Sequence, residues 1–317
     1  MKILVTGGAG FIGSNLVEAL LKDDRVTSVR VLDNLATGSL QNINPFMAES
    51  RFEFVEGDIR SYETCLQACD GIDRISHQAA LGSVPRSIND PLTTNEVNIT
   101  GTLNVFTAAK EKNCSRVIYA ASSSTYGDHP GLPKVEDKIG RPLSPYAVTK
   151  YVNELYARVY GDLYGTEFIG LRYFNIFGPR QNPNGPYAAV IPLFAEAILQ
   201  NKAPLINGDG SHSRDFTFVD NAVQANILAL FTDNKEAVNQ VYNIACGEQT
   251  SLLELFNYLK QEAGSDLQPK HGPERKGDVK HSLADISRAK TLLKYSPGVS
   301  VVAGLAKTLK WYQSNKN

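Results

Sequence analysis

The sequence has few residues of the kinds that bind metal ions or cross-link a chain. Its 317 residues include 4 cysteines and 5 histidines, which are scattered without the paired spacing of a metal site. Lysine and arginine (32) nearly balance aspartate and glutamate (33), so no excess of positive charge predicts nucleic acid or an anionic membrane as a partner. The sequence therefore predicts small-molecule partners, no metal and no nucleic acid.

Long apolar runs are also missing. No stretch is long enough to cross a lipid bilayer, so we expect no membrane span. Apolar residues begin at Ile3, which predicts that no signal peptide precedes the first strand. Together with the unpatterned cysteines, this predicts a cytoplasmic protein with reduced thiols.

What the chain does have is a short apolar run followed by regularly placed glycines. Residues 2–6 have the composition of a strand, Gly7, Gly10 and Gly13 follow, and a helical pattern continues to Leu21. Glycines at this spacing permit a tight turn, close approach of a pyrophosphate and close packing of helix on strand. The helix N-terminus then offers free N–H groups to phosphate. The pattern predicts a dinucleotide-binding turn.

A second apolar run strengthens this prediction. Residues 29–32 end at Asp33, about twenty residues beyond the last glycine, where the dinucleotide fingerprint has an acidic residue. We expect its carboxylate to hold the adenosine ribose hydroxyls and to repel a 2′-phosphate, which favours NAD over NADP. Arg30, on the same strand, leaves this choice open.

Strand and helix patterns alternate along the first half of the chain. They predict an α/β fold with a doubly wound parallel sheet, whose ligands gather at the carboxyl ends of the strands. Beyond Asn175, Gly- and Pro-rich connections interrupt the alternation. We therefore expect a dinucleotide-binding domain over residues 1–175 and a smaller, mainly substrate-binding α/β lobe over residues 176–317, part of which is free to return to the first domain. Strands are expected at residues 2–6, 29–33, 51–55, 73–76, 116–120 and 167–172, and helices at residues 98–110, 145–160, 189–199, 220–230, 252–260 and 301–311.

A tyrosine and a lysine stand four residues apart in the segment SPYAVTK at 144–150. On a helix, Tyr146 and Lys150 share one face. A phenol titrates near ~10, and a neighbouring positive charge favours its ionised form, so the pair is suited to proton transfer. Such pairs also occur by chance on helices, and it is the glycine turn that favours the catalytic interpretation.

Several motifs together resemble those of the extended short-chain dehydrogenase/reductase superfamily. The resemblance is closer to the nucleotide-sugar epimerases, and especially to the UDP-N-acetylglucosamine 4-epimerases. It covers almost the whole chain. The segments that carry it are TGGAGFIGS at 6–14, Asp33, HQAA at 77–80, AASSSTYGD at 120–128, SPYAVTK at 144–150, LRYFNIFGPRQ at 171–181, NGDGSHSRDFTFVDN at 207–221 and GDVKHSLAD at 277–285.

The resemblance implies a Rossmann sheet and a UDP-hexose 4-epimerase that interconverts UDP-N-acetylglucosamine and UDP-N-acetylgalactosamine. Tightly held NAD would oxidise C4 of the sugar transiently to a ketone, and the sugar would present its opposite face before C4 is reduced again. Tyr146 would exchange the proton of the 4-hydroxyl. Lys150 would bind the nicotinamide ribose and, with the nicotinamide ring, lower the pKa of the phenol, and Ser122 would bond to the 4-oxygen. A homodimer is implied through helices near residues 97–110 and 145–160.

The same resemblance implies further site residues. Those expected to hold NAD are Gly7, Gly10, Phe11, Ile12, Gly13, Asp33, Asn34, Thr37, Gly38, Asp58, Ile59, Gln78, Ala79, Ala80, Asn98, Tyr146, Lys150 and Tyr173. Those expected around the UDP-sugar are Ser83, Arg86, Ser122, Ser123, Tyr146, Asn175, Ala189, Val190, Asn207, Arg214, Arg275, Asp278 and Ser282.

Ser282 bears on the choice of sugar. A bulky Tyr at the matching place restricts members of the family to plain hexoses, so the small Ser282 implies room for an N-acetyl group. A UDP-glucose/UDP-galactose 4-epimerase stays the alternative. Ser123 and Ser124 stand where related dehydratases carry an acidic pair, which disfavours dehydration or net oxidoreduction. The presence of Ser122 with the Tyr–Lys pair disfavours a non-catalytic NAD sensor.

Overall fold

The computed structural model describes residues 1–184, 188–273 and 280–315. Its centre is a seven-stranded sheet in the order β11-β6-β5-β4-β1-β2-β3, in which every pair is parallel. Parallel order with helical crossovers confirms the predicted α/β, doubly wound class. The strands are β1 (Lys2–Thr6), β2 (Ser28–Asp33), β3 (Phe52–Glu56), β4 (Arg74–His77), β5 (Arg116–Ser122), β6 (Glu167–Tyr173) and β11 (Gln240–Ile244).

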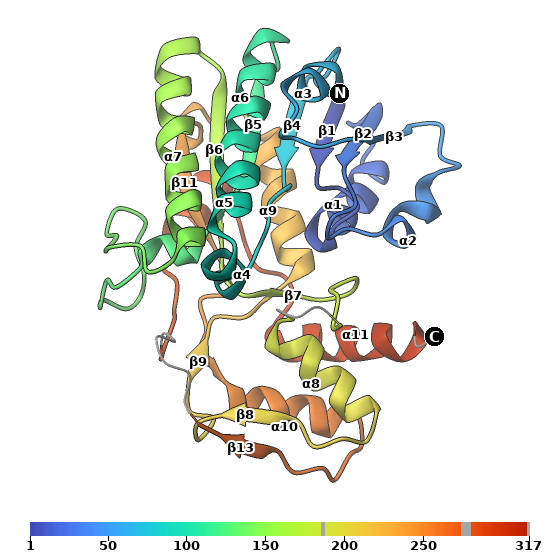
Figure 1. Cartoon of the computed structure of the whole chain (residues 1–317), viewed down its shortest axis with the longest axis vertical. Coiled ribbons are helices and arrows are strands. Elements are labelled where there is room, and N and C mark those ends of the chain that lie inside the picture. The colour runs from blue at the N-terminus through green and yellow to red at the C-terminus, as the bar shows by residue number, and fades with distance from the viewer. Residues whose placement is uncertain (185–187, 274–279, 316–317) are drawn as a thin grey trace.

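Helices cover both faces of this sheet (Figure 1). One layer contains α1 (Phe11–Leu21) and α9 (Val219–Phe231), and the other contains α3 (Tyr62–Ala68), α6 (Thr102–Glu111) and α7 (Pro145–Tyr164). The strands are apolar on both sides because successive side chains enter opposite layers. On β1, Ile3 and Val5 join one buried cluster and Leu4 joins the other.

The chain after Asn175 builds a second, smaller part below the sheet in the view of Figure 1. It contains α8 (Val190–Leu199), α10 (Leu252–Glu262) and α11 (Val301–Ser314), with the paired strands β8 (Leu205–Asn207) and β13 (Lys270–Gly272). Two further short pairs are β7 (Ile176–Phe177) with β10 (Thr217–Phe218), and β9 (Ser213–Arg214) with β12 (Thr250–Ser251). However, α9 and β11, from the same half of the chain, pack on and extend the main sheet.

Short helical turns fill several connections. The helical pattern over residues 98–110 divides into a π-helical turn, η2 (Glu96–Gly101), followed by α6. Within this π-helical turn, the Asn98 side chain accepts from the amide of Leu81 and donates to its carbonyl. The remaining turns are α2 (Leu40–Ile43), η1 (Asn44–Phe46), α4 (Val84–Asn89), α5 (Pro91–Asn95), η3 (Ser123–Tyr126), η4 (Lys235–Ala237) and η5 (Ala289–Leu293).

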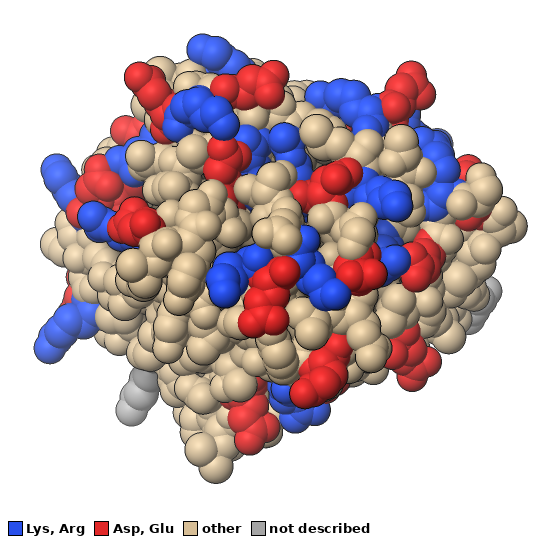
Figure 2. All heavy atoms as spheres, turned by 90° about the horizontal axis from the view of Figure 1, so that it is seen from above, with Lys and Arg blue, Asp and Glu red and all other residues tan. Residues whose placement is uncertain are grey.

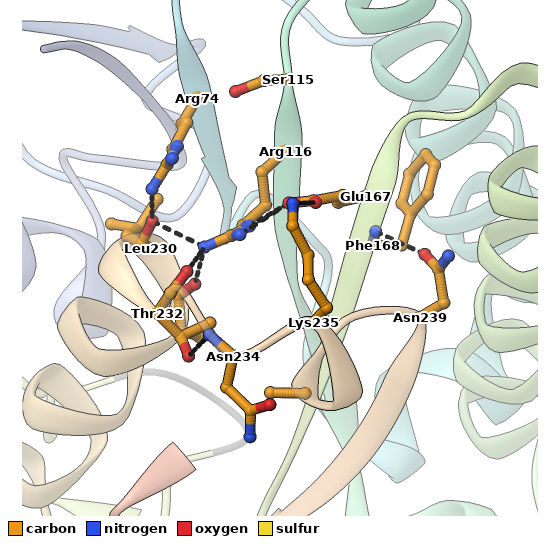
Figure 3. A network of polar contacts seen from close by, with 12 residues as sticks. Arg74, Ser115, Arg116, Glu167, Phe168, Leu230, Thr232, Asn234, Lys235 and Asn239 are labelled. Carbon is orange, nitrogen blue, oxygen red and sulfur yellow. Dashed lines mark hydrogen bonds and ion pairs between the residues drawn. The ribbon is translucent and has the colours of Figure 1, made fainter. Parts of the chain in front are cut away.

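A network of charged side chains lies at the amino ends of β4, β5 and β6 (Figure 3). The Arg116 guanidinium donates to Glu167 Oε2 from Nε (2.9 Å) and Nη2 (2.6 Å). Its Nη1 donates to the carbonyls of residues 229, 230 and 232, which end α9. Arg74 also donates to the carbonyl of Leu230, and Lys235 pairs with Glu167. A positive charge at a helix C-terminus complements its free carbonyls and dipole, so the network fixes α9 against the sheet.

Charges of both signs cover the molecular face at these amino ends. Figure 2 shows Lys and Arg interspersed with Asp and Glu over this face, with no broad area of one sign. In the described part of the chain, no helix is long and apolar enough to cross a membrane.

Candidate active site

A cavity of about 610 Å³ lies at the carboxyl ends of the central strands. It is bounded by the glycine turn after β1, the ends of β2, β4, β5 and β6, and the first turn of α7. Parallel strands place all of these ends at one edge of the sheet. The predicted residues that line it are Gly7, Gly10, Phe11, Ile12, Gly13, Asp33, Asn34, Thr37, Asp58, Ile59, Gln78, Ala79, Ala80, Ser83, Ser122, Ser123, Tyr146, Lys150, Tyr173 and Asn175.

The glycine turn needs its glycines because the backbone is crowded there. Gly7 has φ +69°, and a Cβ on it would lie 2.6 Å from the amide nitrogen of Ala79. A Cβ on Gly13 would lie 2.1 Å from the carbonyl oxygen of Gly7. Only glycine fits at both positions, which leaves the start of α1 open toward the cavity.

Asp33 is held where the fingerprint expects an acid for the ribose. It is 8% exposed, its Oδ2 accepts from the Ala9 amide at 2.9 Å and its Oδ1 from the Leu35 amide at 2.8 Å. Burial raises the pKa of this carboxyl, against the opposing effect of the two amides. Arg30 donates instead to Glu53 and to the carbonyls of residues 68 and 70, and it is not among the described residues that line the cavity. Arg30, which had left the binding of a 2′-phosphate open, therefore has its guanidinium bonded to other protein groups.

Lys150 and Tyr146 meet at the end of β5. Lys150 is 4% exposed, and its Nζ donates to the Ala120 carbonyl at 2.8 Å and lies 5.9 Å from the centroid of the Tyr146 ring. Burial lowers the pKa of Lys150 to about 8. Burial also raises the pKa of Tyr146, and a hydrogen bond with Ser122 opposes this only in part. In the protein alone, Lys150 thus does not lower the pKa of the phenol below its ordinary value, because desolvation of the ring outweighs other effects.

The Ser122 hydroxyl has its acceptor positions filled by its neighbour. Ser124 donates to Ser122 Oγ from its backbone nitrogen at 3.2 Å and from its hydroxyl at 2.9 Å. A hydroxyl has one proton to donate and two lone pairs. The Ser122 proton is consequently available to Tyr146, a donation that favours the phenolate.

Two residues that were predicted to bind the cofactor, Asn98 and Gly38, are not among the described residues that line the cavity. Asn98 is fully buried and bonds both the amide (2.8 Å) and the carbonyl (3.1 Å) of Leu81, and also Thr149 on α7 (3.2 Å). Gly38 lets its loop approach Ala9, whose carbonyl carbon would lie 2.8 Å from a Cβ at this position. Asn98 therefore positions the loop that lines the cavity, and does not itself face it.

Several lining residues were absent from the prediction. The Tyr173 hydroxyl donates to Gln78 Oε1 (3.1 Å) and accepts from Asn226 of α9 (2.7 Å), which also accepts from Gln78 (3.0 Å). Only tertiary structure brings Asn226 under the cavity. Asn226 itself is not among the described lining residues. The lining residues that were not predicted are Leu32, Ala36, Gly57, Arg60, Leu81, Gly82, Thr93, Val97, Ala120, Ala121, Ile176 and Gln181. Of these, Arg60 could have been found from its spacing, since it pairs with Asp58 two residues before it.

A second cavity of about 310 Å³ adjoins the first, because Asn175 and Ile176 line both. Its predicted residues are Asn175, Ala189, Val190, Asn207 and Arg214, and those not predicted are Ile176, Phe177, Ala188, Ile191, His212, Phe216 and Leu252. Arg86 and Ser282 are not among the described residues that line either cavity. Ser282 is half-buried, and its hydroxyl accepts from the Asp215 amide at 3.4 Å. Arg275 and Asp278 lie outside the described residues.

Comparison with known proteins identifies the family to which this chain belongs. The sequence model of the NAD dependent epimerase/dehydratase family matches residues 3–245. The chain belongs to this family. A putative UDP-glucose 4-epimerase of Methanocaldococcus jannaschii is 36% identical to it over 315 residues, covering 99% of each chain.

Solved structures of this epimerase family are similar over the full length. A UDP-N-acetylglucosamine 4-epimerase from Methanobrevibacter ruminantium M1, in complex with UDP-N-acetylmuramic acid, has a TM-score of 0.93 at 40% identity and covers 99% of both chains. A UDP-glucuronic acid 4-epimerase from Bacillus cereus, in complex with UDP-glucuronic acid and NAD, has a TM-score of 0.91 at 35% identity and covers 100% of both. The resemblance read from the motifs is thereby confirmed, and NAD is the cofactor of the family.

Proposed function

We propose that this enzyme of the NAD-dependent UDP-sugar 4-epimerases interconverts UDP-N-acetylglucosamine and UDP-N-acetylgalactosamine. The observation that carries the proposal is the position of Ser122, Tyr146 and Lys150 in one cavity with the glycine turn, next to a second cavity that contains Arg214. A nucleotide sugar that spans both cavities would bring its hexose to Tyr146. C4 carries both the hydroxyl and an unactivated C–H bond, so its inversion requires oxidation of this carbon followed by reduction. A dinucleotide-binding turn next to a proton-transferring Tyr–Lys pair permits both steps.

The first cavity fits NAD by its own features. The backbone at Gly7 and Gly13 leaves no room for side chains and opens the start of α1 to a pyrophosphate. Asp33 lies ready to accept from ribose hydroxyls, and Asp58 with Asn34 lies beyond it. Bound NAD would supply the acceptor and donor of the hydrogen on C4.

The protein would move the proton of the 4-hydroxyl. Tyr146 accepts this proton and returns it when C4 has been reduced from the other side. Ser122, with its lone pairs filled by Ser124, donates its proton toward the reacting oxygens. Lys150, anchored on the Ala120 carbonyl, holds a positive charge beside the phenol.

Elimination of water is disfavoured by the residues around Ser122. Dehydration at C5 and C6 needs a carboxyl group as acid or base next to the hexose. Of the described residues that line the first cavity, the carboxylates are Asp33, which ends β2, and Asp58, which follows β3, so neither lies at the end of β5. Ser123 and Ser124 present hydroxyls at the end of β5 instead. This supports epimerisation as the reaction.

The N-acetylated sugars are proposed because a similar solved enzyme is a UDP-N-acetylglucosamine 4-epimerase. Ser282, whose small size the resemblance relates to the choice of sugar, is not among the described residues that line either cavity, so it would act through the wall formed by its neighbour Asp215. Similar enzymes that act on UDP-glucose and UDP-glucuronic acid make those sugars the alternatives. Purified protein is incubated, without added NAD, with each UDP-sugar in turn, and the products are separated by chromatography. We expect UDP-N-acetylgalactosamine from UDP-N-acetylglucosamine at the highest kcat/KM. A higher kcat/KM with UDP-glucose would contradict the sugar assignment alone, and no epimerisation of any UDP-sugar would contradict the function.

We also propose a homodimer in which α7 meets its copy. Val148, Leu155, Val159 and Leu163 form an apolar stripe on α7 and are 45%, 48%, 50% and 67% exposed. Their spacings of seven, four and four residues keep them on one face of the helix, and a two-fold axis would cover this stripe on both copies at once. Light scattering at micromolar concentration should give twice the monomer mass, whereas the monomer mass alone would contradict the proposal.

A further inference from the structure

The Asp215 carboxylate is completely buried between β9 and β10. Its Oδ1 accepts from the amide of Cys246 at 3.0 Å, and its Oδ2 accepts from the amides of Gly247 and Ala284, both at 3.1 Å. The amide of Glu248 adds a further bond, and the four amides oppose the burial that raises the pKa of Asp215 to about 7. Among the described residues, this acid is thus bonded by backbone amides from two segments that are distant in sequence. A buried carboxylate bonded in this way holds the segments at fixed separation.

The backbone of Asp215 reaches the predicted substrate residues. Its amide donates to Ser282 Oγ at 3.4 Å, and its carbonyl accepts from Asn175 Nδ2 at 3.2 Å. Arg214, which lines the second cavity, is its neighbour in sequence. Three residues expected around the UDP-sugar, from separate parts of the chain, therefore converge on Asp215.

Residues 246–248, whose amides bond the Asp215 carboxylate, are attached to the main sheet. They follow β11, which pairs with β6 as far as Ile244 opposite Tyr173. Tyr173 lines the first cavity. Asn221 of α9 donates from Nδ2 to Cys246 Sγ of this segment at 3.6 Å, and also to the carbonyl of Val299, which precedes α11, at 2.8 Å. The carboxylate of Asp215 thus connects the wall of the second cavity to the main sheet.

We propose that Asp215 is a positioning residue that sets the wall of the nucleotide-sugar cavity in register with Tyr146 and Lys150. Asp215 is not among the described residues that line either cavity, so it acts through Arg214, Asn175 and the segment around Ser282. The proposal rests on the proposed function, because it assumes that the UDP-sugar occupies the second cavity. Without the carboxylate, the wall is not preformed, and substrate binding must order it first.

Asp215→Asn tests this with little change of shape. The amide group can accept with one oxygen only, and its NH₂ group faces an N–H donor. We expect the KM for UDP-N-acetylglucosamine to rise about ten- to a hundredfold, the scale for losing hydrogen bonds to a charged group. The kcat should stay within about threefold, since saturating substrate orders the wall again, and NAD should stay bound. Asp285→Asn is the control, because the hydrogen bonds of its carboxylate, among the described residues, go to the amide and the side chain of Ser287, only two residues away.

The outcomes separate the two claims. An unchanged KM in Asp215→Asn, or a fall in kcat and NAD content with KM unchanged, would overturn the positioning role. Wild type that binds neither UDP nor UDP-sugars would instead overturn the proposed function. UDP alone, titrated into wild type, Asp215→Asn and Asp285→Asn, should lose affinity only in Asp215→Asn.

Hydrogen exchange on the wild type decides the matter if Asp215→Asn does not fold. Peptides that contain the amides of residues 246, 247 and 284 should exchange slowly and become slower when UDP is added. Exchange at the rate of an exposed loop, with no response to UDP, would overturn the proposal.

Discussion

Polar side chains lie at both ends of β4, β5 and β6. They are bonded to other protein groups at the amino ends, whereas they line a cavity at the carboxyl ends. At the amino ends, Arg116 directs all of its nitrogen atoms to protein acceptors, namely Glu167 and the last carbonyls of α9. At the carboxyl ends, Ser122, Tyr146 and Lys150 line a cavity of about 610 Å³. The same strands thus carry a closed network at one end and an open one at the other.

The difference between the two ends separates polar groups that stabilise the fold from polar groups that are held for a ligand. A buried polar group that finds its partners within the protein supports the fold, whereas one held toward a cavity keeps part of its bonding capacity for a ligand. Burial raises the pKa of Tyr146 and lowers that of Lys150, so both groups are desolvated before any substrate arrives. Substitutions at the two ends should therefore separate function from stability.

The largest effect is expected at the open end. Tyr146→Phe removes only the phenol oxygen, so turnover should fall about 10²- to 10⁴-fold, the usual scale for a positioned proton-transfer group. NAD content and unfolding midpoint should stay near those of wild type. Steady-state assays with quantified NAD test this, and near-normal turnover would exclude Tyr146 as the acid–base group.

The closed end should respond in the opposite way. Arg116→Met removes the buried guanidinium from Glu167, which keeps its pair with Lys235. It also leaves the carbonyls at the end of α9 without their donor, which should lower the free energy of unfolding by about 1–3 kcal/mol. Turnover per folded molecule should not change. Urea unfolding measures the loss, and Lys22→Met, which removes an exposed pair with Glu18, should cost less than about 1 kcal/mol. Equal losses in both variants would remove the contrast between a buried and a surface pair.

A substitution beside the open end should change the choice of substrate. Ser282→Tyr adds a ring next to Asp215, where a packed wall cannot give way easily. We expect kcat/KM for UDP-N-acetylglucosamine to fall about a hundredfold, while any turnover of UDP-glucose persists. The exposed Ser287→Tyr is the control. If Ser282→Tyr epimerises both sugars as wild type does, Ser282 does not restrict the sugar.

The smallest effect is one of pH. With a pKa lowered to about 8, Lys150 is protonated below this value and neutral above it. Its positive charge beside Tyr146 is thus lost as the pH rises, and kcat should decline above about pH 8. A profile from about pH 6 to about pH 10, with NAD retention checked at each end, tests this. A kcat that rises through the whole range would contradict a role for the charge of Lys150.

The sequence predicted the features that depend on neighbours along the chain. The glycine turn, Asp33 and the Tyr146–Lys150 pair are local patterns, and the structure brings all of them to one cavity. The strands of the first half were placed within a few residues for the same reason. The family resemblance, and not a local pattern, placed Asn175 and Arg214 among the residues around the UDP-sugar, and both line the second cavity.

Features made by distant segments were not predictable in this way. The sequence of β11 is a short apolar run like many others in the chain, so its composition does not mark it as a strand of the main sheet. Its place there is set by its pairing with β6. Asn226 and Asp215 act through residues far away in sequence, so no local spacing marks them. Asn98 remains predicted as an NAD residue, and the sequence did not show that its amide bonds both backbone groups of Leu81, 17 residues away.

The most direct test of the account follows the hydrogen on C4 of the sugar. UDP-N-acetylglucosamine carrying deuterium at C4 is incubated in ordinary water with purified enzyme and no added NAD, and the product is analysed by mass spectrometry and NMR. Transient oxidation by retained NAD predicts UDP-N-acetylgalactosamine that keeps the deuterium at C4. Product that has lost its deuterium to water would contradict the mechanism proposed for Ser122, Tyr146 and Lys150.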